Sequence, residues 1–123
     1  MDLGDSLLLA ARILTGGAFL IIGLRNIGNY KMIADLLSAN RFPLPGLLAA
    51  SGIAMQVGFG GLMMTGYYPV VAALGLAAFT VLATLMVHSF WTFKAEDRGT
   101  QINSFLGNMI MAGGLLALAA AGL

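Results

Sequence analysis

Five polar side chains stand inside or at the ends of long apolar stretches: Arg12, Gln56, His88, Trp91 and Asn108. His88 is the single histidine, and histidine is the side chain that exchanges a proton near neutral pH. Arginine, glutamine, asparagine and histidine donate hydrogen bonds, and tryptophan offers a flat aromatic surface. This set suits a quinone. The quinone carbonyls need hydrogen-bond donors, the quinone ring needs an apolar wall, and the isoprenoid tail needs access to lipid.

Each of these residues also has a purely structural explanation. Arg12 lies about one and a half turns inside its apolar stretch, where its long side chain reaches the head groups by snorkelling. If it points inward instead, Gln56 is the nearest partner by depth. Trp91 fits an aromatic belt at the membrane surface. Asn108 and His88 can hydrogen-bond between helices and serve only to hold them together.

The composition excludes several classes of protein. The chain of 123 residues has no cysteine and one histidine, which rules out disulfides, thiolate metal sites and two-histidine haem ligation. We therefore predict no metal and no covalently bound cofactor on this chain, and any redox group must diffuse in or belong to a partner. The net charge of +1 is too small and scattered for nucleic acid binding.

The chain is too apolar for a water-soluble domain. It is 59% hydrophobic and 9% charged, with a mean hydropathy of +0.93. Four apolar stretches reach the roughly 20 residues that cross a bilayer. They cover residues 7–27, 46–66, 70–91 and 103–123. Between the first two, residues 28–45 have apolar side chains at helical spacing, which predicts a short interfacial helix that ends before two prolines.

The connections between the spans are short, which predicts an antiparallel four-helix bundle, all-α and integral to the membrane in a single domain. Basic residues mark one side of it. Five lie in or beside the first and third connections: Arg25, Lys31, Arg41, Lys94 and Arg98. The positive-inside rule places these connections in the cytoplasm and both termini outside.

The third connection also defines a candidate site. If residues 94–102 form a hairpin, His88 and Trp91 at the end of the third span meet Asn108 near the start of the fourth. We expect these three side chains to converge on a quinone ring near the cytoplasmic surface. No residue is predicted to be catalytic.

Two spans have small residues every four positions. These residues are Gly46, Ala50, Ala54 and Gly58 in the second span, and Gly113, Ala117 and Ala121 in the fourth. Small side chains let helix backbones approach closely in lipid, where hydrophobicity does not drive association. We expect the two stripes to be helix-packing faces within one bundle. The alternative is an interface with a partner or a second copy.

Several motifs resemble the DoxX family of small four-helix membrane proteins. The resemblance follows nearly the whole chain in order, and its most specific part is HSFW near the end of the third span. The other segments are ARILTGGAFLIIGLRNIGNY, RFPLP and INSFLGNMIMAGGLL. By position, the matching residues are Arg12, Gly23, Arg25, Pro43, Pro45, Gly60, Gly61, Gly66, His88, Phe90, Trp91, Asn108, Gly113 and Gly114.

The resemblance implies a role next to redox proteins, because the family is named for a small subunit of a quinone-linked oxidising system. Members commonly carry a glutamate where this chain has Gln56, so a buried pair of Arg12 with a carboxylate becomes a pair with a neutral amide. This departure favours an accessory role over proton-coupled chemistry carried by this chain alone.

Two functions follow from the sequence. The first is a non-catalytic accessory subunit of a quinone-linked electron-transfer assembly in a bacterial inner membrane, lining or shielding a quinone or lipid site. The second is a purely structural subunit with no redox role. The partners expected in either case are the lipid bilayer and a larger redox membrane complex or a homo-oligomer.

Overall fold

The computed structural model describes residues 1–89 and 92–123, and the regular elements within them are α-helices. They are α1 (Leu3–Gly28), α2 (Tyr30–Ala39), α3 (Pro45–Thr65), α4 (Pro69–Val87) and α5 (Ala95–Ala121). All but α2 are long and apolar enough to cross a membrane. The chain is therefore a small all-α integral membrane protein, as the sequence predicts.

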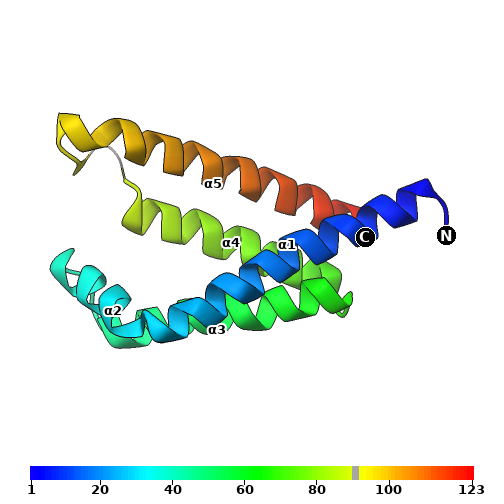
Figure 1. Cartoon of the computed structure of the whole chain (residues 1–123), viewed down its shortest axis with the longest axis horizontal. Helices are drawn as coiled ribbons and strands as arrows, with labels where there is room; N and C mark the ends of the chain where they lie inside the picture. The colour runs from blue at the N-terminus through cyan, green and yellow to red at the C-terminus, as the bar shows by residue number, and fades with distance from the viewer. Residues whose placement is uncertain (90–91) are drawn as a thin grey trace.

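The four long helices run alternately up and down (Figure 1). The N-terminus, the C-terminus and the α3–α4 turn lie at one end, which we call the hairpin end. The opposite end, which we call the α2 end, holds α2 and the α4–α5 connection. This confirms the antiparallel four-helix bundle. A short helix also stands where the interfacial one was predicted, and it packs on α3.

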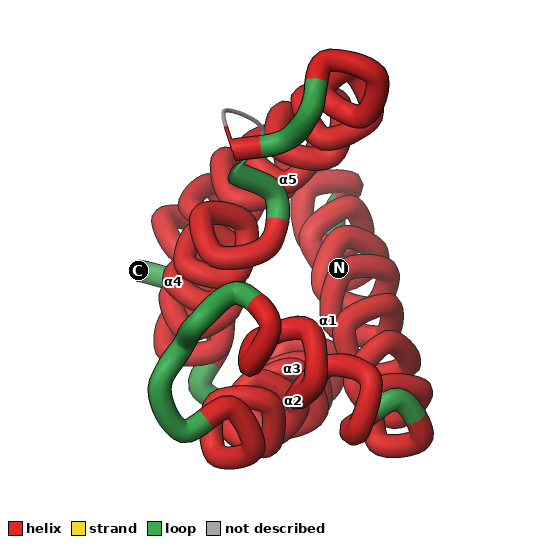
Figure 2. Tube along the Cα trace, turned by 90° about the vertical axis from the view of Figure 1, so that its left-hand side faces the viewer, coloured by secondary structure: helices red, strands yellow, loops and turns green. Residues whose placement is uncertain are grey.

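The bundle consists of two tightly packed helix pairs rather than a closed ring. The first helix packs mainly on α3, and α4 packs mainly on α5, with α3 and α4 joining the pairs. Within the described chain, the backbone of α1 comes close to that of α5 at few positions and to that of α4 at none. The view along the bundle shows the resulting separation of α1 from the α4–α5 pair (Figure 2). The side of the bundle between α1 and the α4–α5 pair is therefore loosely packed.

Glycines let α1 and α3 approach closely. A Cβ added at Gly16 would lie 2.6 Å from the carbonyl oxygen of Gly60 and 2.6 Å from the amide nitrogen of Met64. A Cβ added at Gly60 would lie 2.8 Å from the amide nitrogen of Leu20. At Gly23 the added atom would also clash with α3. Backbone therefore meets backbone along this seam, as in membrane helix pairs built on small residues.

The two predicted small-residue stripes do not form such seams, and this expectation needs correction. Four of their residues with side chains are exposed: Ala50, Ala54, Ala117 and Ala121. A Cβ added at Gly58 or Gly113 would meet no atom within 4 Å, and Gly46 faces the Tyr30 hydroxyl. The reason is helix rotation, because α3 turns Gly60 toward α1 and leaves the predicted stripe on its outer face.

The core lies toward the hairpin end, where the two helix pairs meet. Met63 of α3, Leu76 of α4 and Leu115 of α5 are 0%, 0% and 1% exposed, and Phe19 of α1 packs with them. Ala72 and Ala73 of α4 complete the contact between the pairs. This cluster ties all four long helices together at one end, and the cavity described below lies at the other end.

The third and fourth spans differ from their predicted limits. The third ends at Val87 instead of residue 91, and α5 begins at Ala95 instead of residue 103. The Ser89 carbonyl oxygen accepts hydrogen bonds from the backbone N–H and the hydroxyl of Thr92, and both residues lie outside the α-helices. The polar stretch expected to be a hairpin is helical, because Glu96 and Asp97 favour a helix N-terminus.

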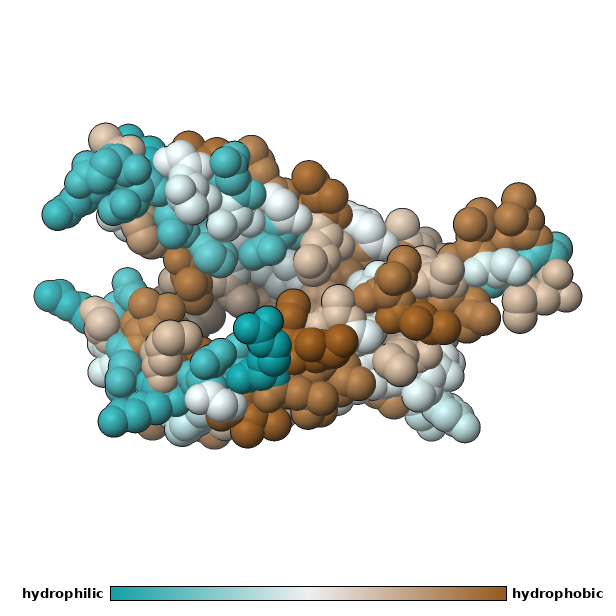
Figure 3. Space-filling model, viewed as in Figure 1, coloured by the Kyte–Doolittle hydropathy of each residue, from teal (hydrophilic) through white to brown (hydrophobic). Residues whose placement is uncertain are grey.

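Polar residues gather at the α2 end, and apolar residues cover the middle and the hairpin end (Figure 3). The first turns of α5 and the region of α2 form two polar groups with a hollow between them on this face. Such a distribution fits a bundle whose α2 end meets water and whose middle meets lipid.

Candidate functional site

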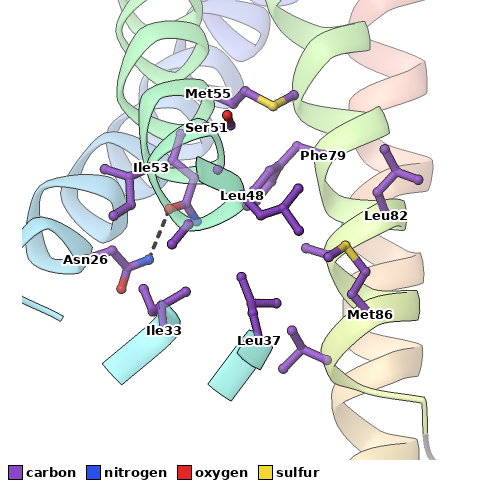
Figure 4. A pocket seen from close by; sticks show the side chains of 15 residues that line it. Asn26, Ile33, Leu37, Leu48, Ser51, Ile53, Met55, Phe79, Leu82 and Met86 are labelled. Atoms are coloured by element: carbon purple, nitrogen blue, oxygen red, sulfur yellow. Dashed lines mark hydrogen bonds between the residues drawn. The ribbon is translucent and has the colours of Figure 1, made fainter. Parts of the chain in front are cut away.

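A cavity opens at the α2 end between α2, α3 and α4, and the last turn of α1 reaches it (Figure 4). Its volume is about 280 Å³. The walls are mainly apolar, with Ile33 and Leu37 from α2, Leu48 from α3 and Met86 from α4. The cavity exists because α2 and the end of α4 diverge beyond the core. It is the kind of concave apolar space that binds small lipophilic molecules.

The polar feature of the cavity is an amide pair. The Asn26 side-chain nitrogen donates to Gln56 Oε1 at 3.0 Å, joining the end of α1 to the middle of α3. Gln56 is 8% exposed, so this amide is nine-tenths buried. The hydrogen bond satisfies its carbonyl oxygen, which would otherwise be costly to bury.

The amide nitrogen of Gln56 donates to no residue that the structure describes. Within the same residues, Arg12 Nε is the one fully enclosed side-chain nitrogen or oxygen atom that lacks a hydrogen bond. The free N–H groups of Gln56 are therefore reachable by a small molecule in the cavity that Gln56 lines. An amide in this state is a ready donor for a carbonyl oxygen.

An aromatic ring and a hydroxyl complete the wall. Phe79 of α4 lines the cavity beside α3, and a Cβ added at Gly52 would lie 3.3 Å from its ring. Gly52 thus leaves room for the ring to lie close to α3. Ser51 lines the cavity and is exposed, which supplies a second donor nearer the outside. A flat ligand would find an aromatic face, and two donors, in one space.

The structure places His88 elsewhere. Its Nδ1 lies 2.8 Å from Gln101 Oε1, so the histidine joins the end of α4 to the second turn of α5. Its backbone N–H also donates to the Thr84 carbonyl and caps α4. Met86 and Val87 line the cavity, whereas His88 does not. The residue therefore fastens two helices just outside the cavity.

Asn108 does not meet His88. Since Gln101 faces His88 at one end of the α4–α5 pair and Gly122 faces Val70 at the other, Asn108 lies about two turns deeper than Gln101. Its side chain makes no hydrogen bond within the described chain. Trp91, the third member of the predicted site, lies outside the described residues. The structure thus does not bring His88 and Asn108 together as expected.

Arg12 does not meet Gln56 either. Gly23 is the α1 residue level with Gln56, and Arg12 lies about three turns nearer the hairpin end. The partner of Gln56 is Asn26, which the sequence analysis missed. Counting depth from the predicted span ends could not find it, because α1 begins at Leu3 and is shifted against α3. The only usable signal was that Asn26 is an amide close to a span end.

No group of three or more histidine, cysteine or carboxylate side chains that could hold a metal ion occurs in the described ranges. The polar groups that the structure does assemble at this site are neutral amides and a hydroxyl. They can orient a ligand by hydrogen bonds, and the apolar walls can hold its ring.

Comparison with known proteins places the chain among small membrane proteins. A model of the family described as DoxX matches residues 7–89. The chain is also similar to a protein of Escherichia coli (strain K12) named "Inner membrane protein YphA", with 26% identity over 116 residues. The aligned region is 94% of this chain and 83% of that relative. No solved structure gives a significant match.

Proposed function

The chain belongs to the DoxX family, and from this premise we propose that it is an accessory membrane subunit that holds a quinone in the cavity at its α2 end. The observation that carries the proposal is Gln56, which is nine-tenths buried in an apolar cavity and whose N–H groups donate to no described residue. A quinone carbonyl accepts such a hydrogen bond. We therefore place the proposed site at Gln56 and Asn26 instead of at His88 and Asn108.

The rest of the cavity suits the same ligand. Phe79 supplies a face for a flat ring, and Leu37, Leu48 and Met86 supply apolar contacts for a tail. The cavity adjoins Leu82, which is 58% exposed on the outer side of α4, so a tail has a route to lipid. A soluble polar substrate would find few partners there.

We place the electron carriers in a partner protein. The sequence has no cysteine and one histidine, and that histidine is hydrogen-bonded to Gln101. The chain's own residues would position the quinone and keep water from it. The name of the Escherichia coli relative supports an inner-membrane location for this chain as well.

The test is quinone binding to the purified protein in lipid nanodiscs, measured by calorimetry with short-chain ubiquinone and menaquinone analogues. Gln56→Leu keeps the approximate volume and removes the donor. We expect it to weaken binding by about twofold to tenfold, since a neutral hydrogen bond contributes about 0.5 to 1.5 kcal/mol net and 1.4 kcal/mol corresponds to a factor of ten.

The matched control is Gln101→Leu, the same substitution at a glutamine that lies outside the cavity. It should leave quinone affinity unchanged. Decylbenzene, which has a ring and a tail but no carbonyl, should bind the unaltered protein and the Gln56 variant equally. If the unaltered protein binds quinones no better than decylbenzene, the quinone proposal is wrong.

The outward-facing small residues favour a second candidate, a structural subunit with no redox role. Gly58, Gly113 and Ala117 leave smooth helix faces that could receive other transmembrane helices. Failure of quinone binding, together with recovery of the protein in a complex that loses its assembly in a Gly58→Leu variant, would support this candidate instead.

A further inference from the structure

Two donors on α1, at the end of the bundle opposite the proposed quinone cavity, have no hydrogen-bond partner among the residues that the structure describes. Arg12 Nε is fully enclosed yet makes no hydrogen bond within the described residues. The Thr15 hydroxyl, three residues on, makes none there either, whereas Thr65, Thr80 and Thr84 each donate to a carbonyl one turn earlier. An enclosed donor without an acceptor, such as Arg12 Nε, is costly. This cost points to an acceptor supplied from outside the chain.

The carboxylates nearest in sequence are already engaged. Asp2 accepts from the backbone N–H of Asp5 at 2.8 Å, and Asp5 accepts from the backbone N–H of Asp2, so the pair caps the start of α1. Arg12 forms no ion pair with them. Its positive charge is therefore uncompensated within the described chain.

A groove lies where α1 and α5 diverge, and Thr15 is the one of the two donors that lines it. Ala11 and Thr15 line it from α1, and Met111, Gly114 and Ala117 line it from α5. Its volume is about 360 Å³. A Cβ added at Gly114 would meet no atom within 4 Å, so α1 does not fill the space. The walls are apolar except for Thr15, which suits a hydrocarbon chain held by dispersion contacts.

The depth of Arg12 identifies the acceptor. Gly16 packs against Gly60 and Met64 near the end of α3, and Arg12 lies one turn further toward the α3–α4 turn. Tyr67 and Tyr68 in that turn are 68% and 72% exposed, as expected for aromatic side chains at the head-group level. The guanidinium therefore lies where lipid phosphates are concentrated, rather than in the hydrocarbon core.

We propose that this is a binding site for an anionic glycerophospholipid in the leaflet at the hairpin end. The phosphate accepts hydrogen bonds from Arg12 and Thr15, and one acyl chain lies in the α1–α5 groove. A guanidinium presents several donors that match phosphate oxygens, and its charge makes these hydrogen bonds stronger than neutral ones. A lipid at this position also fills the gap that separates α1 from α5.

The test is native mass spectrometry of the delipidated full chain, titrated with phosphatidylglycerol or phosphatidylcholine of matched chains. Arg12→Leu should weaken phosphatidylglycerol binding by about tenfold, as expected for losing one basic contact near an anionic surface plus its hydrogen bonds. Arg12→Lys should retain most of the affinity. Thr15→Val should weaken it by about threefold, as expected for losing one neutral hydrogen bond.

The matched control is Arg25→Leu, the same substitution on the same helix at an exposed position near the α2 end. It should bind phosphatidylglycerol like the unaltered protein. Equal affinity of the Arg12→Leu and Arg25→Leu variants overturns the proposal. Should Arg12→Leu fail to fold, the Thr15→Val variant decides in its place, and unaltered affinity there also overturns it.

A photo-crosslinking residue at Ala117 separates lipid from protein as the occupant. In native membranes it should yield adducts with phospholipid. Adducts formed with a second polypeptide whose acidic residue is required for crosslinking would show that Arg12 pairs with a partner carboxylate, which also overturns the lipid site.

Discussion

At the level of single residues, the bundle joins its helices through neutral amides and an imidazole. Asn26 with Gln56 joins α1 to α3, and His88 with Gln101 joins α4 to α5. An amide pair such as Asn26 with Gln56 is less costly to bury in a membrane protein than an ion pair, because no charge is taken out of water. The one charge that is partly buried belongs to Arg12, and it is the group for which we propose a lipid phosphate as acceptor.

The pair of His88 and Gln101 should stabilise the bundle without affecting the cavity. We expect His88→Ala and Gln101→Ala each to lower the free energy of unfolding, with a coupling energy of about 0.5 to 1.5 kcal/mol in a double-mutant cycle. The measurement is reversible unfolding in mixed micelles. Quinone affinity should stay unchanged in both variants, because neither residue lines the cavity.

Two findings together would contradict this prediction: no coupling energy between His88 and Gln101, and a loss of quinone affinity in His88→Ala as large as in Gln56→Leu. They would support a quinone site at His88 instead.

Among the helices, the contact between α1 and α3 is made by residues other than the small-residue stripe predicted to pack. Its close contacts depend on Gly16 and Gly23, which are seven residues apart on α1, and on Gly60 of α3, and none of them belongs to a four-residue repeat of small residues. The regularly spaced stripe through Ala54 and Gly58 instead faces outward. A four-residue repeat of small residues thus marks a smooth helix face, but it does not say whether that face packs within the chain.

Glycine-to-alanine substitutions should distinguish the face of α3 that packs on α1 from the face of α3 that points outward. Gly16→Ala places a Cβ 2.6 Å from backbone atoms of Gly60 and Met64, which cannot rotate away. We expect a loss of about 1 to 3 kcal/mol in the free energy of unfolding, typical of overpacking. Gly58→Ala places its Cβ in open space and should change the free energy of unfolding by less than about 1 kcal/mol.

Thermal unfolding in detergent, followed by circular dichroism, measures both variants. Equal stability of Gly16→Ala and the unaltered protein would mean that the α1–α3 seam does not hold the bundle together.

The molecule as a whole has two different ends. The hairpin end holds the core and both termini, and the α2 end holds the polar groups and the proposed quinone cavity (Figures 1 and 3). Five of the six basic residues lie in or next to the segments at the α2 end, whereas Arg12 lies near the hairpin end. This asymmetry predicts that the α2 end faces the cytoplasm.

Single cysteines test this orientation cleanly, because the sequence has none of its own. Ser6 and Ala95 are both exposed and lie near opposite ends of the bundle. In intact cells, a membrane-impermeant maleimide should label a cysteine at Ser6. It should reach a cysteine at Ala95 only after the membrane is broken. Labelling of the two positions from one side, or in the reverse order, would contradict the prediction.

Much of this architecture follows from the sequence. Apolar length determines the four membrane helices, since a bilayer accepts only stretches long enough to cross it. The short connections impose alternating directions, and the polar break at residues 28–45 allows room for only a short helix. The family is also recognisable from the order of its motifs. None of these features depends on which side of a helix faces inward.

The candidate site depended on information that the sequence does not hold. In a soluble helix, the boundary between polar and apolar faces reveals the buried side. In lipid both faces are apolar, so close packing decides rotation and vertical shift. The contact of Gly16 with Gly60 sets the position of α1 along α3. As a result Asn26, and not Arg12, lies level with Gln56 and hydrogen-bonds to it. Small differences in backbone approach therefore determined which polar residues meet.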